Sequence, residues 1–129
     1  MSVYASQDDV KPFTQFISDD IHPDLFYSAL DKADDWVNNQ LISNGLPTYD
    51  NNVPSQLTTA AAYYAVSDIV LVLYQGEDML TQYDVWFNKA KDMMNVYILA
   101  QKDLLASTVL ADKNLVKHSK SKPYSRKLL

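Results

Sequence analysis

Apolar and polar positions recur along most of this chain with the period of an α-helix rather than that of a strand. After Pro23, apolar residues lie three or four positions apart and so form one stripe of a helix: Phe26, Ala29, Leu30, Ala33, Val37 and Leu41. The opposite face is polar: Asp31, Asp34, Asp35, Asn38 and Asn39. Pro23 at an early helical position, with Asp24 beside it, places the start of this helix at residues 21–24.

The most apolar segment runs from Leu57 to Tyr74 and is apolar nearly all round. Such a helix is buried on several sides, so we expect it to start at Pro54 or Ser55 and to form the centre of the fold. The run 69–73 (IVLVL) could suggest a strand, but the alanines before it and the total length of the segment favour a helix. The run 60–74 is interrupted by Ser67 and Asp68 and is shorter than the roughly 20 apolar residues of a bilayer span. The segment therefore predicts a core helix and no membrane partner.

Two further helices complete the pattern. A fourth is expected from about Leu80 to Ala106 or beyond, with this stripe: Tyr83, Phe87, Ala90, Met94, Tyr97, Ile98, Gln101 and Leu105. A short first helix begins at Ser6, whose hydroxyl can cap it, and ends near Phe16. Gly45 and Gly76 each follow a periodic segment, where glycine ends helices. Residues 46–54 form a loop, so the fold class is all-α, a bundle of about four helices.

Charge is distributed very unevenly between the two ends of the chain. Residues 112–129, called the arm here, hold six of the eleven Lys and Arg residues against one Asp, a net charge of +5. Residues 1–111, called the body, hold five basic and fifteen acidic residues, a net charge of −10. The arm has too few apolar residues to form a packed unit, so we expect an extended basic C-terminal arm attached to a helical bundle.

Composition narrows the possible chemistry. The chain has no cysteine, which excludes disulfides, thiolate metal sites and thiol nucleophiles. The N-terminus lacks the basic and apolar stretches of a signal peptide, so we expect an unprocessed intracellular product. His22 stands at a helix start and His118 in the arm, which leaves no histidine pair for a metal. We expect no catalytic residues, no cofactor and no metal site, and hence a protein that is not an enzyme.

Acidic groups are interpreted as structural rather than as ligands. Neighbouring Asp residues on a helix point about 100 degrees apart and do not converge on one cation. The loop Tyr49-Asp50-Asn51-Asn52 lacks the glycine and glutamate of a calcium loop. Asp68 lies inside the most apolar helix, so it should meet a tyrosine hydroxyl, a lysine or a neighbouring subunit. Alternatively, Asp68 and Ser67 occupy a narrow solvated stripe.

Nine tyrosines and two tryptophans exceed what a small bundle core needs. Large amphipathic rings are favoured at protein interfaces, although core packing explains any single one of them better. The candidate subunit interface consists of Tyr27, Trp36, Tyr49, Tyr63, Asp68 and Trp86, and Tyr4 belongs to the same aromatic group.

The arm has three possible roles. It could bind nucleic-acid phosphate without sequence specificity, although an acidic body repels DNA lying alongside it. It could dock in an acidic protein groove, which we favour. A third possibility is that the arm only helps to keep the protein soluble. The residues proposed for docking are Lys113, Lys117, Lys120, Lys122, Tyr124, Arg126, Lys127, Leu128 and Leu129.

Taken in order, the segments resemble the small helical head-completion proteins of tailed viruses of phage or prophage type, also called head–tail connectors or adaptors. The resemblance covers roughly residues 3–110. It begins with residues 4–13 (YASQDDVKPF) and continues with residues 26–37 (FYSALDKADDWV). Val53-Pro54 then leads into an Ala-rich helix that ends Leu73-Tyr74, and a last helix carries Tyr83 and Ala90 before the tail.

This resemblance implies a structural protein of the virion, made in the host cytoplasm and located at the head–tail junction. Such proteins form a homo-oligomeric ring, commonly a dodecamer, beneath the portal protein. The ring extends the channel for double-stranded DNA, which passes without sequence specificity, and carries the tail or a stopper protein. The arm would bind the portal. The competing hypothesis is a small helical nucleic-acid-binding or regulatory module tethered by its basic tail.

Overall fold

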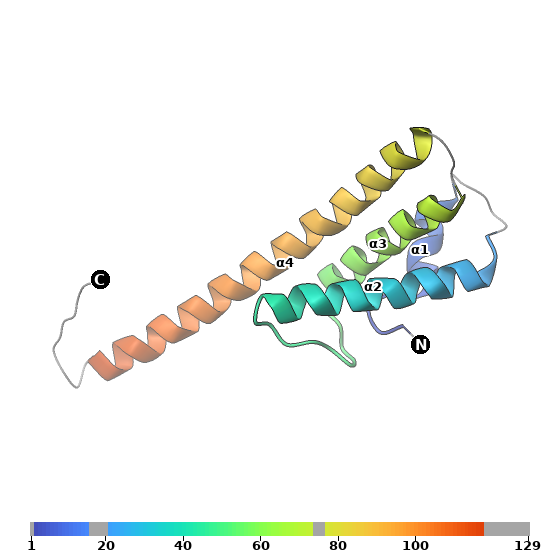
Figure 1. Cartoon of the computed structure of the whole chain (residues 1–129). Coiled ribbons are helices and arrows are strands. Elements are labelled where there is room, and N and C mark those ends of the chain that lie inside the picture. The colour runs from blue at the N-terminus through green and yellow to red at the C-terminus, as the bar shows by residue number, and fades with distance from the viewer. Residues whose placement is uncertain (1, 16–20, 74–76, 118–129) are drawn as a thin grey trace. The chain divides into compact units, whose positions relative to one another are not determined.

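The computed structural model describes residues 2–15, 21–73 and 77–117, and within these ranges the regular structure is entirely helical (Figure 1). The helices are α1 (Gln7–Thr14), α2 (Pro23–Ser43), α3 (Ser55–Leu73) and α4 (Glu77–Lys117). The prediction of an all-α bundle of about four helices is confirmed. The chain divides into two units, Met1–Ile98 and Leu99–Leu129. The first, called the core unit here, contains α1 to α3 and the first part of α4.

Both N-terminal helices start where the sequence predicts. The Asp9 carboxylate accepts hydrogen bonds from the Ser6 backbone N–H at 2.8 Å and from the Ser6 hydroxyl at 3.0 Å. Asp9 therefore takes part in the N-terminal cap together with Ser6. Its carboxylate accepts from the Ser6 backbone N–H, one of the donors that have no partner within the helix. At the start of α2, the His22 Nδ1 accepts from the Asp24 N–H at 3.1 Å. His22 thus caps α2.

Gly45 ends α2 as its position after a periodic segment predicts. Its φ is +70°, a left-handed conformation that favours glycine. The N–H of Leu46 donates back to the Leu41 carbonyl at 2.9 Å, and the N–H of Gly45 donates to the Ile42 carbonyl at 3.0 Å. Leu41 and Leu46 are both buried. This arrangement is the Schellman motif, and it turns the chain into the loop that precedes α3. The second glycine, Gly76, lies outside the described residues.

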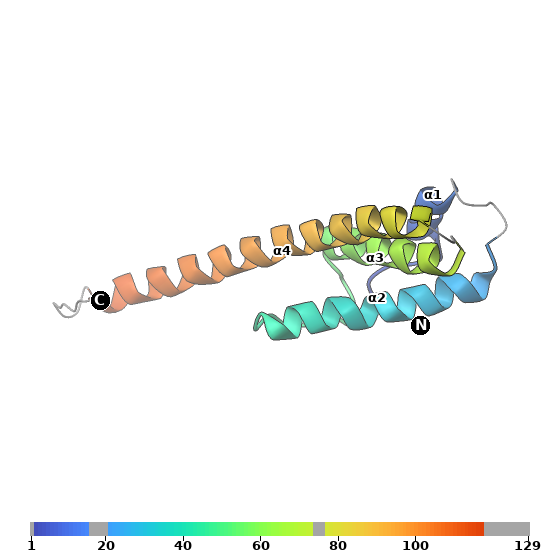
Figure 2. The same cartoon turned by 45° about the horizontal axis from the view of Figure 1, so that its top comes forward.

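Helix α3 is the centre of the core, as its apolar composition predicts. Nine of its nineteen residues are buried: Leu57, Ala60, Ala61, Ala62, Ala65, Val66, Ser67, Ile69 and Val70. The small alanine side chains let neighbouring helices approach closely, and α3 contacts both α1 and α2. Figures 1 and 2 show α3 alongside α2. The predicted stripe of α2 faces this core: Phe26, Ala29, Leu30, Ala33, Val37 and Leu41 are all buried.

One helix of the described ranges, α3, is long and apolar enough to cross a membrane by length and composition. Half of its most apolar window (50%) is already buried against the rest of the chain. A core helix of a globular bundle has these same properties, because it is surrounded by other helices.

Helix α4 begins close to the expected residue and continues past Ala106. It was expected from about Leu80 to Ala106 or beyond, and it runs from Glu77 to Lys117. The first six residues of the arm, 112–117, are therefore helical rather than extended. The remainder of the arm, 118–129, lies outside the described residues. The predicted body boundary at residue 111 falls inside α4, whereas the core unit ends at Ile98.

Candidate interaction surfaces

Within the core unit, aromatic side chains join α4 to the helices beneath it in two groups. The first consists of Phe13 on α1, Tyr63 on α3 and Trp86 on α4, with ring centroids 5.3 to 5.8 Å apart. The Lys89 ammonium lies 5.3 Å from the Trp86 ring centroid. All three rings are half-buried. Tyr63 and Trp86, both expected at a subunit interface, thus pack on each other within one chain.

The second group lies on the adjacent side of α3. Trp36 on α2 stacks on Tyr64 with centroids 4.9 Å apart, and Tyr64 meets Phe87 of α4 at 6.0 Å. Tyr83 stacks on Phe87 at 5.4 Å, and Lys91 lies 5.0 Å from the same ring. The two groups therefore connect α4 to α3 through the consecutive residues Tyr63 and Tyr64. Trp36, also an interface candidate, therefore contributes to the intramolecular packing.

A hydrogen-bonded network ties the N-terminal segment and the 46–54 loop to the helices. The buried Tyr4 hydroxyl donates to Asn38 Oδ1 at 2.5 Å and accepts from the Tyr49 N–H at 3.1 Å. The Tyr49 and Tyr97 hydroxyls are 2.7 Å apart. Burial, followed by this hydrogen bond, raises the pKa of Tyr97 above its ordinary value. Tyr4 is a core residue, and Tyr49 is engaged within the chain.

Asp34 anchors the chain in front of α1. Its two carboxylate oxygens accept from the backbone N–H groups of Val3 and Tyr4, at 2.8 and 3.1 Å. An ionised acceptor strengthens both bonds, and they hold the N-terminal segment against α2. The sequence assigned Asp34 to the polar face of α2 without this role. Asp34 is half-buried, whereas its neighbour Asp35 is exposed.

Asp68 meets a lysine, one of the partners expected from its apolar surroundings. Its Oδ1 lies 3.3 Å from Lys32 Nζ of α2. The Asp68 side chain is 15% exposed, whereas that of Lys32 is 56% exposed. Lys32 therefore extends its ammonium from solvent to an acidic group at the edge of the core. Burial, and next the charge of Asp68, raise the pKa of the neighbouring Tyr64.

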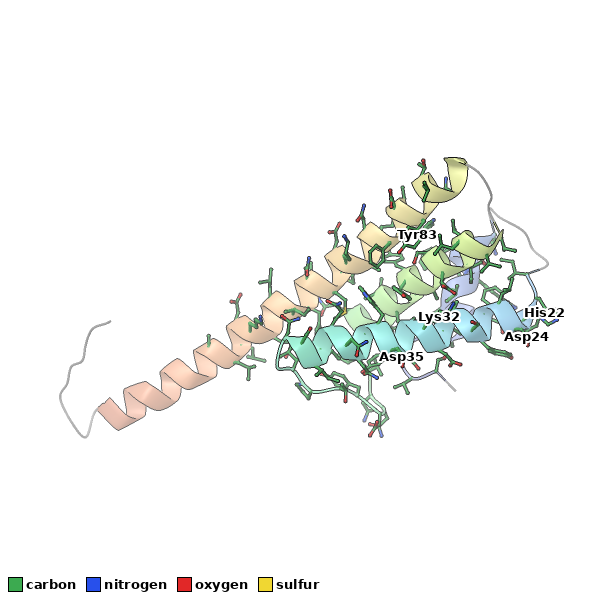
Figure 3. The ribbon with its side chains drawn as sticks, viewed as in Figure 1. His22, Asp24, Lys32, Asp35 and Tyr83 are labelled. Atoms are coloured by element: carbon green, nitrogen blue, oxygen red, sulfur yellow. The ribbon has the colours of Figure 1, made fainter. Side chains whose placement is uncertain are left out.

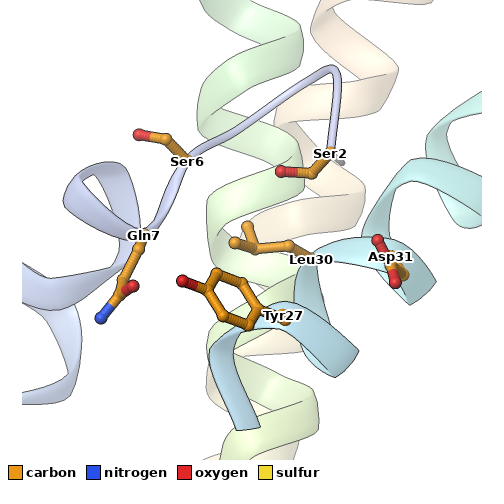
Figure 4. Close-up of a pocket in the computed structure, with 6 residues that line it drawn as sticks. All are labelled: Ser2, Ser6, Gln7, Tyr27, Leu30 and Asp31. Carbon is orange, nitrogen blue, oxygen red and sulfur yellow. The ribbon is translucent and has the colours of Figure 1, made fainter. Parts of the chain in front are cut away.

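Of the six interface candidates, Tyr27 is the one that projects into solvent, with 57% of its surface exposed. It lines a groove of about 460 Å³ between the N-terminal segment and α2, together with Ser2, Ser6, Gln7, Leu30 and Asp31 (Figure 4). Leu30 forms a buried apolar floor, and the Tyr27 hydroxyl points across the groove toward Gln7 (Figure 4). The groove is open and mainly apolar.

Carboxylates line the outer face of α2. Asp24, Asp31 and Asp35 are separated by seven and four residues, so they share one face of the helix, and all three are exposed. Figure 3 shows Asp24 beside His22 at the start of α2 and Asp35 further along the helix. Among the described residues, no three His, Cys, Asp or Glu side chains converge as metal ligands. The outer face of α2 is therefore described as a patch of negative charge.

Exposed leucines on α4 were missed by the sequence prediction. Leu99, Leu104 and Leu105 are 62%, 60% and 52% exposed. Leu105 was expected on the core stripe because it follows Ile98 by seven residues, but that stripe is buried only as far as Ile98. The signal for this surface was available in the sequence, because residues 99–111 (LAQKDLLASTVLA) have apolar residues on several faces of the helix.

The proposed docking residues of the arm fall partly within α4. Lys113 and Lys117 belong to its last turns, whereas Lys120, Lys122, Tyr124, Arg126, Lys127, Leu128 and Leu129 lie outside the described residues. His118 does so too. Comparison of the chain with protein-family models, with curated proteins and with solved structures finds no match.

Proposed function

We propose that this chain is a structural protein of a tailed virus, a head–tail connector that forms a ring beneath the portal and joins the capsid to the tail. The observation that carries the proposal is the separation of charge along the chain. A body of net charge −10 is followed by an arm of net charge +5. The order of the helices, which agrees with the resemblance in the sequence, supports the same assignment.

The acidic body suits a channel through which DNA must pass. Asp24, Asp31 and Asp35 lie along the outer face of α2 and are exposed, so this face repels phosphate. A protein that held DNA by this surface would need lysine or arginine there instead. In the proposed ring, therefore, DNA meets carboxylates and passes without being retained.

The unusual ionisable groups of the core unit have structural roles in this proposal. Tyr4 and Tyr97 are buried and hydrogen-bonded to neighbouring segments, and Asp68 pairs with Lys32. Each of these contacts fixes one part of the chain to another. We therefore assign the protein an assembly function rather than a catalytic one.

The basic arm is the part that we propose to bind the portal. Four of its six cations, Lys120, Lys122, Arg126 and Lys127, follow the end of α4 within ten residues. A short segment with this charge suits an acidic groove on a protein partner, where opposite charges steer association and fix its register.

Two deletions test whether the arm binds the portal protein that the proposal assigns as its partner. Deletion of 118–129 leaves α4 whole to Lys117, and deletion of 112–129 removes all six cations. We expect both variants to keep the helical circular-dichroism signal of the core unit and to lose co-sedimentation with the portal. A matched pair of charge reversals, Lys122→Glu in the arm and Lys11→Glu at an exposed position of α1, should separate arm-specific binding from net charge.

Retained attachment of both deletion variants would overturn the portal-binding role. The nucleic-acid alternative predicts a different result: the full chain would bind arbitrary duplex DNA, with affinity that falls steeply as salt rises. Loss of such binding on deletion of the arm would favour that alternative over the connector.

A further inference from the structure

The second half of α4 exposes an apolar surface that a solitary helix does not normally carry. Residues 99–111 comprise eight apolar residues (LA, LLA and VLA) and five polar ones, of which only Lys102 and Asp103 are charged. A helix apolar on all sides is typically buried among others. In this chain, however, the Leu99 and Leu105 side chains are 62% and 52% exposed. Among its described residues, the unit that begins at Leu99 contains only this helix.

Helix stability leads to the same conclusion. Isolated helices shorter than about 12 to 15 residues are marginal in water, and most helical stability in proteins comes from packing of an apolar face. The 99–117 segment is the C-terminal part of α4, and its Leu99 and Leu105 side chains remain in contact with solvent. A covering partner would both bury these leucines and stabilise the helix.

Charge indicates which partner fits. The net charge of residues 99–111 is zero, whereas the body as a whole carries −10. Two copies of the chain repel each other through most of the body surface, and this repulsion is smallest where the two contacting segments are neutral. A strongly charged partner would gain little from a neutral apolar helix. The surface therefore fits a second copy of the same segment.

We propose that residues 99–111 of α4 form a contact between copies of this chain, with Leu99 and Leu105 in the contact. This inference rests on the proposed connector function for the purpose of the assembly. It adds to that function by naming the contact between subunits. Fully burying one leucine removes roughly 100 Å² of apolar surface from water. These half-exposed side chains supply much less than the ~800 Å² per partner of a standard interface, so the contact is weak on its own.

Self-association of the purified full chain, without portal or DNA, tests the proposal. Sedimentation velocity over about a hundredfold range of concentration should show the wild type passing from monomer to oligomer. We expect the double variant Leu99→Ser with Leu105→Ser to require roughly tenfold or more higher concentration for the same degree of association. Ile42→Ser is the matched control, because Ile42 is 64% exposed on α2, outside this surface, and its loss should leave association unchanged.

A second variant separates loss of contact from loss of helix. Ala106 is exposed, and Ala106→Lys introduces a good helix former three residues after Asp103, an arrangement that favours the helix. It should keep the helical signal at 222 nm and still abolish association. A wild type that stays monomeric throughout, or variants that associate as the Ile42→Ser control does, would overturn the proposal. Portal attachment is measured separately with the arm deletions, so failure of one proposal does not imply failure of the other.

Discussion

Replacing Tyr4 with phenylalanine removes a single hydroxyl at the centre of the hydrogen-bonded network that joins Tyr4, Asn38 and Tyr49. That hydroxyl donates to Asn38 Oδ1 at 2.5 Å and accepts from the Tyr49 N–H at 3.1 Å. The ring itself stays in the core, because phenylalanine fills nearly the same volume. The substitution therefore removes two hydrogen bonds between segments 34 and 45 residues apart without opening a cavity.

The cost follows from the groups left behind. An unsatisfied buried donor or acceptor costs about 1 to 3 kcal/mol, and both bonds here are partly shielded rather than deeply buried. We therefore expect about 2 kcal/mol lower free energy of unfolding. With an unfolding entropy of about 2.1 cal/mol/K per residue, a chain of 129 residues should lose roughly 7 °C in Tm.

Urea unfolding followed by circular dichroism and thermal scanning would measure both quantities. Tyr27→Phe is the control, because the same atom is removed from a tyrosine that is 57% exposed and has no hydrogen-bond partner among the described residues. Its effect should stay within about 0.5 kcal/mol. Equal losses in the two variants would refute the reasoning, since the hydroxyl of Tyr4 would then contribute nothing through its network.

Three further predictions concern the core unit. The pKa of Tyr97 is raised in the folded state, so the folded chain keeps the Tyr97 proton at pH values where the unfolded chain loses it. The free energy of unfolding should therefore fall as pH rises above about 10. Tyr97→Phe should flatten that fall, as measured by urea midpoints from about pH 8 to 11. A double-mutant cycle of Lys32→Met and Asp68→Asn should give a coupling of about 0.5 to 1 kcal/mol that shrinks at high salt; additive losses would contradict the ion pair. Gly45→Ala should cost about 1 kcal/mol in urea unfolding through backbone conformation alone, since a Cβ there meets no atom within 4 Å, and a neutral result would contradict the left-handed turn.

Prediction of the helices succeeded because their signals are local. The stripe of α2 is buried at every position that the spacing selected, and Gly45 stands where the chain leaves the helix. Periodicity and capping act over one or two turns, so neighbouring residues suffice to read them. The end of α4 was harder to place, because charged and polar residues after Ala111 weaken the period without breaking the helix.

The packing of the aromatic residues could not be predicted from the sequence. The surplus of aromatic residues draws attention to Trp36, Tyr63 and Trp86, but composition does not reveal which rings meet. In the folded chain they pack across three helices, whereas Tyr27 remains exposed. An apolar side chain on a helix face predicts burial only if another element faces it. For this reason the leucines of α4, which belong to an otherwise ordinary helical pattern, were not recognised as exposed.

By itself, the sequence determined the helices, their polar and apolar faces and the separation of charge between body and arm. Tertiary structure decided the partners: Lys32 for Asp68 across 36 residues and Tyr97 for Tyr49 across 48. The physical reason is that a helix face depends on spacing along one chain segment. A contact depends on which distant segment the folded chain brings opposite that face, and many arrangements are compatible with the same spacing.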